Sequence, residues 1–367
     1  MLHLTGWPAA TQAHSRATGR VGTVISPRTS ERLGRHLLTS GVSGASAAVV
    51  RPGEVVWSAG AGRLASGADI TAATPFMLGS VSKVVTGTLV MQLVEQGLLD
   101  LDGDINRVLS FVVHLPCGGA PITLRGLASH TSGIVDRNPE YASPYGPGDP
   151  QQSLADFLRS YLTPDGAEYD PQGNFGPAGT YAYSNVGVAL AALAAEHRMG
   201  RSFADLCSAS LFGPLGLRNT GWFLRDFADQ LLIAEPRDDA GRVLPHYGYP
   251  TYPDGQLRSS AADLGQFLAT VLAGGVWDRV RVLRPDTLDR MWETQHSAPQ
   301  EDQLLFWTRK QGLIGHLGGD DGVLTFLYLH PHRAVGLVLL TNQQTAEARA
   351  LGRTLVREVL LDPSGLL

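Results

Sequence analysis

The stretch Met77-Leu-Gly-Ser80-Val-Ser-Lys83 opens a long, largely apolar segment that ends at Gly97. The segment Met77 to Gln96 is too long for a strand and is predicted to be a helix. Residues three apart lie on one face of a helix, so Ser80 and Lys83 are expected to be neighbours. A serine hydroxyl needs an adjacent base to act as a nucleophile, and an uncharged lysine amine can be that base. The stretch therefore predicts a nucleophile, Ser80, with its base, Lys83.

Lysine usage supports this interpretation. Of the 29 lysine and arginine residues, only Lys83 and Lys310 are lysines. Arginine does not lose its proton in proteins, so it cannot replace a lysine that acts as a base. A lysine kept in a chain that otherwise uses arginine indicates a role that needs deprotonation.

A second candidate motif, Tyr183-Ser-Asn185, precedes the Ala/Leu-rich segment Val186–Glu196, which is predicted to be a helix. A tyrosine near a cationic lysine can hold or relay a proton, because the cation favours the phenolate. An asparagine amide both donates and accepts hydrogen bonds, so it can orient the lysine and a substrate. Alternatively, Asn185 is the N-cap of the helix and Tyr183 packs beside it. The residues alone leave both interpretations open.

The third candidate motif is His316-Leu-Gly318-Gly319. Glycines in a strand allow a substrate to approach the backbone closely. The same H-x-G pattern occurs at His246-Tyr-Gly248, but in a loop rich in proline and tyrosine with no such strand after it. We therefore favour His316, although a turn beside a surface histidine would give the same pattern.

Apolar runs near both ends of the chain predict a sheet, and the middle is mainly helical. The predicted strands are 46–50, 55–58, 322–329 and 335–340, and the predicted helices include 30–40, 122–129, 153–162, 260–274 and 345–361. The fold class is therefore α/β (α+β): an antiparallel sheet flanked by helices, with an inserted helical domain. We predict a loose leader at 1–26, a sheet domain from 27–75 and 306–367, and a helical domain at 76–305. The active site would lie in the cleft between the two domains.

Composition excludes several function classes. The formal net charge is −5, so no basic face for nucleic acid is expected. No apolar run approaches the roughly 20 residues that span a bilayer, so no membrane partner is expected. The first 20 residues do not read as a signal peptide, which predicts a cytoplasmic protein. Cys117 and Cys207 fit no metal site and are expected to be ordinary thiols. No metal or other cofactor is predicted.

Together these motifs resemble the serine β-lactamase and penicillin-binding-protein superfamily, on its class C side. Three further stretches carry the resemblance: Leu124-Arg-Gly-Leu-Ala-Ser-His130-Thr-Ser-Gly133, Pro214-Leu-Gly-Leu217 and Ser259-Ser-Ala-Ala-Asp263-Leu264. The resemblance implies a sheet flanked by helices, a helical domain and a site in the cleft between them. It implies that Ser80 accepts the acyl group, that Lys83 and Tyr183 shuttle protons, and that Asn185 orients the substrate. By the same resemblance, the backbone N–H groups of Ser80 and Gly319 would form the oxyanion hole.

The third motif departs from class C β-lactamases, which carry Lys-Thr-Gly where this chain has His316-Leu-Gly318. That variant is similar to some DD-peptidases, D-aminopeptidases and related esterases. We therefore expect a serine hydrolase acting on a small ester or amide. The main alternative is a transacylase that passes the acyl group to an amine or alcohol. A non-catalytic binding module is a third reading, which the intact motifs disfavour.

Overall fold

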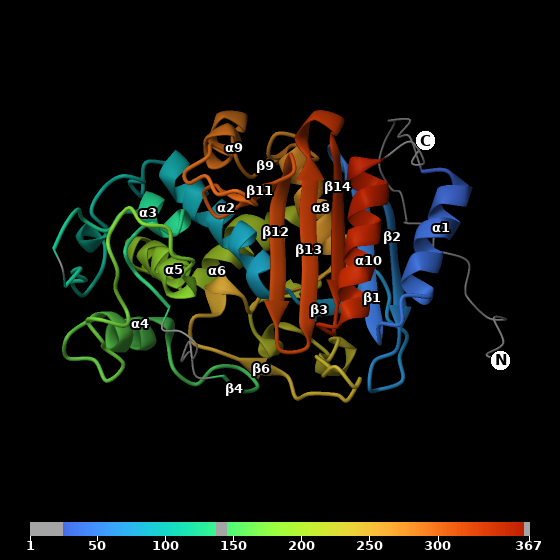
Figure 1. The fold of residues 1–367 in the computed structure, drawn as a ribbon, viewed down its shortest axis with the longest axis horizontal. Helices are drawn as coiled ribbons and strands as arrows, with labels where there is room; N and C mark the ends of the chain where they lie inside the picture. Colours follow the sequence, from blue (N-terminus) through green and yellow to red (C-terminus); the bar gives the residue numbers. More distant parts are fainter. Residues whose placement is uncertain (1–24, 117, 137–144, 363–367) are drawn as a thin grey trace.

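The structure, a computed structural model, describes residues 25–116, 118–136 and 145–362, and its centre is a seven-stranded antiparallel sheet (Figure 1). In spatial order the strands are β10 (Asp302–Gln303), β11 (Thr308–Lys310), β12 (Leu313–Asp320), β13 (Val323–His330), β14 (Val335–Thr341), β1 (Gly44–Arg51) and β2 (Glu54–Gly62). β1 pairs with β14, with Ala45 opposite Thr341. The prediction that both ends of the chain build one sheet is therefore confirmed.

Helices cover both faces of the sheet. α1 (Pro27–Leu38) and α10 (Ala346–Val356) pack on one face, and α8 (Ala261–Leu272) packs on the other (Figure 1). Successive strand residues point to opposite faces, so Ala47 joins the core under α1 and α10 while Ala48 joins the core with α8. Both faces are buried, which is why these strands read as continuous apolar runs.

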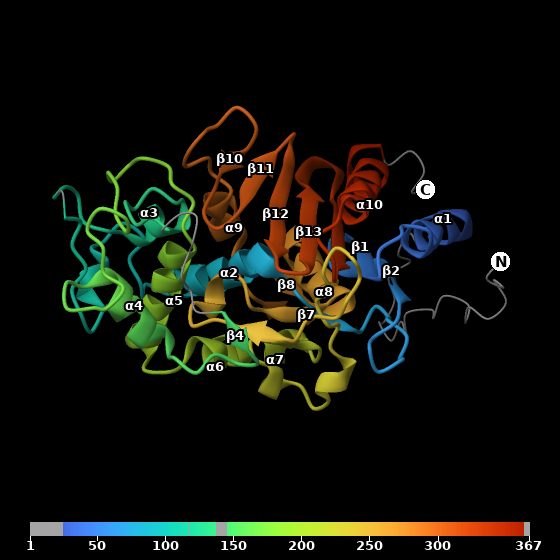
Figure 2. The ribbon, with the colours of Figure 1, turned by 60° about the horizontal axis from the view of Figure 1, so that its bottom comes forward.

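Most of the remaining helices are grouped to one side of the sheet (Figure 1). The remaining helices are α2 (Ser82–Glu95), α3 (Leu124–Ala128), α4 (Leu154–Leu162), α5 (Asn185–Met199), α6 (Phe203–Cys207), α7 (Gly213–Leu215) and α9 (Pro285–Met291). Thr123, Ser153 and Ser260 are the N-caps of α3, α4 and α8, at or next to the first residue of each predicted helix range. In Figure 2, α2 lies between the helices α3–α5 and the sheet. Almost every residue of α2 is buried, so its N-terminus is held by packing on all sides.

The predicted helix from Met77 begins later than expected, at Ser82. Pro75–Met77 is instead a strand, β3, paired with β7 (Arg258–Ser260). Gly79–Val81 forms a 3-10 turn, η1. The local apolar pattern cannot show that residues 75–77 have a strand partner more than 180 positions away, and this tertiary pairing decides their conformation.

Several short pairs were not predicted, because strands of two or three residues leave no periodic signal. They are β4 (Gly146–Pro147) with β6 (Tyr247–Gly248), β8 (Val276–Trp277) with β9 (Val280–Arg281), and β5 (Thr220–Gly221) with β7. The predicted division at residues 76 and 305 stays a prediction. α8 lies inside the predicted helical insertion and packs on the sheet.

Some predictions fall outside the described residues. Residues 1–24 of the predicted leader and Cys117 are among them. Cys207 is buried at the end of α6, where burial raises the pKa of its thiol. The thiolate is the reactive form of cysteine, so this thiol is suited to packing.

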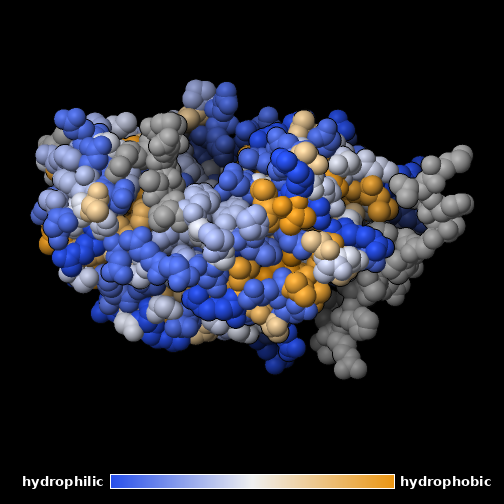
Figure 3. Space-filling view, turned by 90° about the horizontal axis from the view of Figure 1, so that it is seen from below, coloured by the Kyte–Doolittle hydropathy of each residue, from blue (hydrophilic) through white to orange (hydrophobic). Residues whose placement is uncertain are grey.

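The face seen from below is mostly hydrophilic, with hydrophobic residues gathered near the middle of the view (Figure 3). Exposed apolar side chains of the chain include Leu231, at 69% exposure, and Leu232. Among the helices of the described ranges, none combines the length and the hydropathy that crossing a bilayer requires.

Candidate active site

Ser80 is the middle residue of the turn η1, which directly precedes α2. The turn packs so closely against β12 that a methyl group at Gly79 would lie 2.9 Å from Gly319 N. Gly79 also has a φ of +54°, a left-handed conformation that glycine adopts without strain. A side chain at position 79 would therefore move Ser80 away from β12.

Lys83 is 1% exposed, and its Nζ atom has three oxygen partners. Nζ lies 3.0 Å from Ser80 Oγ, 2.6 Å from Asn185 Oδ1 and 2.8 Å from the carbonyl oxygen of Asp254. The structure thus brings Ser80 and Lys83 together, although through a 3-10 turn that runs into α2. Nζ donates a hydrogen bond to each of these three oxygens, so Lys83 can accept the proton of Ser80 only after it has released one of its own.

Tyr183 is the second side chain that contacts the nucleophile. Its hydroxyl donates a hydrogen bond of 2.8 Å to Ser80 Oγ, and Lys83 Nζ lies 5.0 Å from the centre of its ring. The ring of His130 packs against the Tyr183 ring at a centroid distance of 4.4 Å. The Tyr183 side chain is 38% exposed, so the phenol connects the buried Lys83 with solvent.

Asn185 is the first residue of α5, and Ser184 is the N-cap of that helix. The alternative in which Asn185 caps the helix is therefore wrong, and its side chain is free to bind Lys83. Asp136 holds this helix end in place. Its carboxylate accepts hydrogen bonds from Asn185 N at 2.7 Å, Ser184 Oγ at 2.8 Å and Val186 N at 3.2 Å.

His316 lies on β12, is 5% exposed, and has its ring 6.4 Å from that of Tyr183. Its Nδ1 atom is 2.7 Å from Leu317 O, so Nδ1 carries the proton and Nε2 is an acceptor. Nε2 has no hydrogen-bond partner among the described residues. The structure therefore places an unused acceptor nitrogen next to the Tyr183 ring.

Gly318 and Gly319 form the contact between β12 and the nucleophile turn. A methyl group at Gly318 would collide with Leu78 O and Thr325 Oγ1, and Gly319 N lies next to Gly79. β11 pairs with β12 only as far as Gly315. Beyond that residue, the edge of β12 lies beside η1 rather than beside another strand of the sheet.

Three residues with structural roles at the site were not selected from the sequence as site residues: His130, Asp136 and Asp254. His130 belongs to the stretch Leu124–Gly133 that carries the family resemblance, but that stretch does not indicate a contact between His130 and Tyr183. Asp136 reaches Asn185 from 49 positions away, and Asp254 acts through its backbone carbonyl. The loop that contains Asp136 has no periodic pattern, so its contact with Asn185 leaves no local signal. The contact of Asp254 leaves none either, because every residue has a backbone carbonyl.

Burial dominates the electrostatics of the site. It lowers the pKa of His316 to about 4 and holds that of His130 well below the usual range, with Lys83 adding to both shifts. Both imidazoles are therefore neutral at pH 7. Burial raises the pKa of Asp254 to about 7 against the opposing effect of Lys83, and it also raises the pKa of Asp136.

The beta-lactamase family model matches residues 30–361 of this chain. The chain belongs to the beta-lactamase family. Its members are serine hydrolases, and the predicted α/β fold with an antiparallel sheet and flanking helices is confirmed.

Individual beta-lactamase-family relatives match most of the chain. Penicillin-binding protein 4 of Amycolatopsis lactamdurans is 29% identical over 321 residues, which cover 82% of this chain and 80% of that protein. The human protein beta-lactamase-like 1 is 28% identical over 325 residues, and the match spans 61% of its length. The solved structure of SurE with D-Leu has a TM-score of 0.68 and 27% identity, covering 92% of this chain and 74% of that chain.

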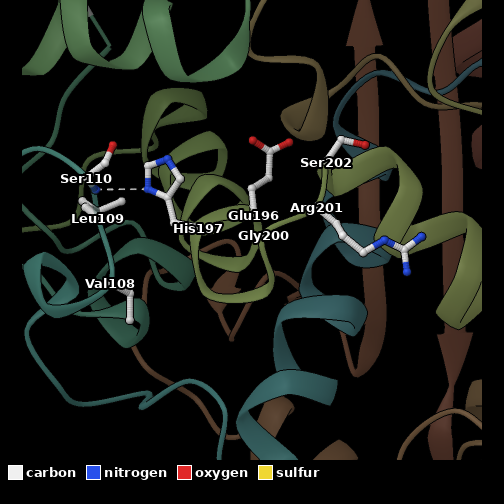
Figure 4. Close-up of a pocket in the computed structure, with 8 residues that line it drawn as sticks. All are labelled: Val108, Leu109, Ser110, Glu196, His197, Gly200, Arg201 and Ser202. Atoms are coloured by element: carbon white, nitrogen blue, oxygen red, sulfur yellow. Dashed lines mark hydrogen bonds between the residues drawn. The ribbon is translucent and has the colours of Figure 1, made fainter.

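A pocket lies at the far end of α5 from the site (Figure 4). It is lined by Val108, Leu109, Ser110, Glu196, His197, Gly200, Arg201 and Ser202. His197 Nδ1 accepts a hydrogen bond of 3.2 Å from Ser110 N. A helix rises about 1.5 Å per residue, which separates this pocket from Asn185 by roughly 18 Å along the axis. None of the candidate site residues lines it. Within the described ranges, no group of three or more histidine, cysteine or acidic side chains is placed to hold a metal ion.

Proposed function

We propose that the chain is a serine hydrolase that cleaves a small ester or amide through an acyl group carried on Ser80. The observation that carries the proposal is that Ser80 Oγ lies within hydrogen-bond reach of both Lys83 Nζ and Tyr183 Oη. A nucleophile with an adjacent base, which is itself oriented by a third group, is the arrangement that nucleophilic catalysis requires. Asn185 is that third group, because its side chain holds Lys83.

In the first step, Ser80 Oγ forms a bond to the substrate carbonyl carbon and its proton passes to the Lys83–Tyr183 pair. The two groups are coupled, so the proton belongs to the pair rather than to either residue. The developing oxyanion would face the N–H groups of Ser80 and Gly319. The bond to the leaving group then breaks, and Tyr183 returns the proton to it. In the second step, a water oxygen bonds to the acyl carbon and its proton passes through the Lys83–Tyr183 pair to Ser80 Oγ. The bond between Oγ and the acyl carbon then breaks and releases the free acid.

Two features favour hydrolysis of an uncharged ester or amide. The Tyr183 side chain is 38% exposed, so water can reach the acyl group. His316 is neutral at pH 7, so the third motif provides no cation to hold a substrate carboxylate of the kind that β-lactam substrates carry. Small esters and amides without that carboxylate therefore fit the site better.

The test is intact-mass spectrometry of the wild type and Ser80→Ala after exposure to a p-nitrophenyl ester and to a fluorophosphonate. We expect a mass increase on the wild type alone. An equal increase on both proteins would place the nucleophile elsewhere, and no adduct on either would favour a binding module. Product analysis with added amines or alcohols then separates the two reactions, since an acceptor that diverts product from the free acid would show acyl transfer.

A further inference from the structure

Beyond Gly319, β12 ends in a carboxylate surrounded by tyrosines. Asp320 Oδ1 accepts a hydrogen bond of 3.1 Å from the Tyr145 hydroxyl, and Oδ2 accepts one of 3.2 Å from the Tyr249 hydroxyl. The ring of Tyr145 lies 4.9 Å from that of Tyr249 and 5.5 Å from that of Tyr247. Three aromatic rings and one carboxylate thus gather at one point.

This cluster borders the nucleophile turn. Asp320 directly follows Gly319, the proposed oxyanion donor. A methyl group at Gly255 would collide with the Tyr249 hydroxyl and would lie 3.6 Å from the carbonyl carbon of Gly79. The Tyr249 hydroxyl therefore lies beside the turn that carries Ser80.

The position along β12 shows which half of a substrate would meet the cluster. Tyr183, which protonates the leaving group in the proposed reaction, lies near His316. Asp320 lies on the other side of Gly318 and Gly319 along the strand. The leaving group would therefore extend toward His316, and the acyl group toward Asp320.

Asp320 has hydrogen-bond donors but no cation. Its third partner is Asp321 N, at 2.9 Å, and none of the ion pairs among the described residues involves Asp320. A second acid, Asp254, is 4% exposed nearby, and its Oδ2 atom has no partner among the described residues.

Burying a carboxylate without a counter-ion is costly, and burial raises the pKa of Asp320. Burial also raises the pKa of the Tyr145 and Tyr249 hydroxyls, so both remain neutral donors at pH 7. A ligand cation would supply the missing charge, and aromatic faces also attract cations.

We propose that Asp320, with Tyr145, Tyr247 and Tyr249, forms a subsite for an organic cation, an ammonium group carried by the acyl part of the substrate. The subsite rests on the proposed function, because it defines the substrate of the acylation at Ser80. The enzyme would then prefer cationic acyl esters over neutral esters of the same shape.

The test uses two p-nitrophenyl esters that differ only in charge: 4-(trimethylammonio)butyrate and its neutral isostere, 5,5-dimethylhexanoate. Their kcat/KM values are compared after correction for their rates of hydrolysis in buffer. We expect the wild type to prefer the cationic ester by about tenfold, since a desolvated cation–aromatic contact and a carboxylate together supply an energy of this order. Asp320→Asn should bring the ratio close to one.

Asp321→Asn is the matched control, because it removes the same charge from the exposed neighbouring residue. It should keep the preference of the wild type. A ratio near one in the wild type, or equal losses in both variants, would overturn the subsite while leaving the hydrolase proposal intact. If neither ester acylates Ser80, both proposals fail.

A second measurement does not depend on turnover of the cationic ester. A short alkyltrimethylammonium ion should inhibit wild-type hydrolysis of the neutral ester competitively and should inhibit Asp320→Asn at least about tenfold more weakly. Equal inhibition of both proteins would contradict the subsite. Thermal unfolding of each variant shows whether it remains folded.

Discussion

Lys83 is held by two carbonyl-type oxygens and the nucleophile, in a chain that otherwise prefers arginine. A guanidinium is larger than an ammonium, and it does not release its proton. The spacing of Ser80 and Lys83 was enough to predict their contact. Asn185 was also predicted to orient the lysine, and its Oδ1 atom binds Nζ. The carbonyl oxygen of Asp254 could not be predicted, because it lies 171 positions away in the chain and every residue has a carbonyl.

We expect Lys83→Arg to lower the acylation rate by about 10²- to 10⁴-fold, the range of general acid–base catalysis. Ser80→Ala should abolish acylation. The measurement is the release of p-nitrophenol in a rapid-mixing experiment. Lys310→Arg is the control, because it makes the same change at the other lysine, which is exposed on β11. An active Lys83→Arg enzyme would refute the role proposed for the lysine.

At the scale of the element, Asp136 fixes the N-terminus of α5 by accepting three hydrogen bonds. Asp136→Ala leaves the buried donors of Ser184, Asn185 and Val186 without this partner. Each hydrogen bond to a charged group contributes about 1.5–3 kcal/mol, and the losses are not additive. We expect the free energy of unfolding to fall by about 3 kcal/mol, measured by urea denaturation.

Asp156→Ala provides the comparison for this prediction. Asp156 lies in the first turn of α4 and contacts the cap Ser153 at the surface. Asp156→Ala should lower the free energy of unfolding by less than about 1 kcal/mol, as is usual for a substitution at an exposed position. Equal costs for the two variants would show that Asp136 has no special role at the site.

The contact between β12 and η1 gives a second prediction at this scale. A methyl group at Gly318 has no room beside Leu78 O, so Gly318→Ala should force β12 away from the nucleophile turn. Losing one oxyanion donor typically lowers kcat by about 10²- to 10³-fold, and we expect a loss of that size. Gly34→Ala in α1 has open space around it and should leave kcat unchanged. A fully active Gly318→Ala enzyme would contradict the proposed oxyanion hole.

The starts of some helices could be predicted from the sequence, and the start of α2 could not. Ser153 and Ser260 were predictable caps, because a cap and its helix are neighbours in the chain. The start of α2 at Ser82 was not predictable, because β3 and the left-handed Gly79 depend on packing against β7 and β12.

At the scale of the whole molecule, Asp254 makes stability depend on pH. Its pKa is about 7 in the folded protein, because of burial, and near 4 in an unfolded chain. Between these values, the folded state retains a proton that the unfolded chain has released. The contribution of Asp254 to the free energy of unfolding is therefore fully present below pH 4 and is lost as the pH rises toward 7.

Asp254→Asn removes this titration. We expect the free energy of unfolding of the variant, relative to wild type, to rise between pH 4 and pH 7 and to level off above that range. Urea denaturation at pH 4.5, 6 and 8 measures the trend. Asp289→Asn is the control, because it removes a carboxylate at an exposed position on α9. A difference that does not change with pH would contradict the raised pKa of Asp254.

The pairing of β1 with β14 joins Ala45 to Thr341, almost 300 positions apart. Contacts between residues so distant in the chain slow folding, because a long loop must close before they form. β12, which supports Ser80, is added to β1 only through β13 and β14. During synthesis, β1 of the β1–β2 hairpin therefore has no β14 to pair with until most of the chain has been made. Ser80 can become reactive only after β1 and β14 have paired, so labelling of this serine would measure the last stage of folding rather than the first.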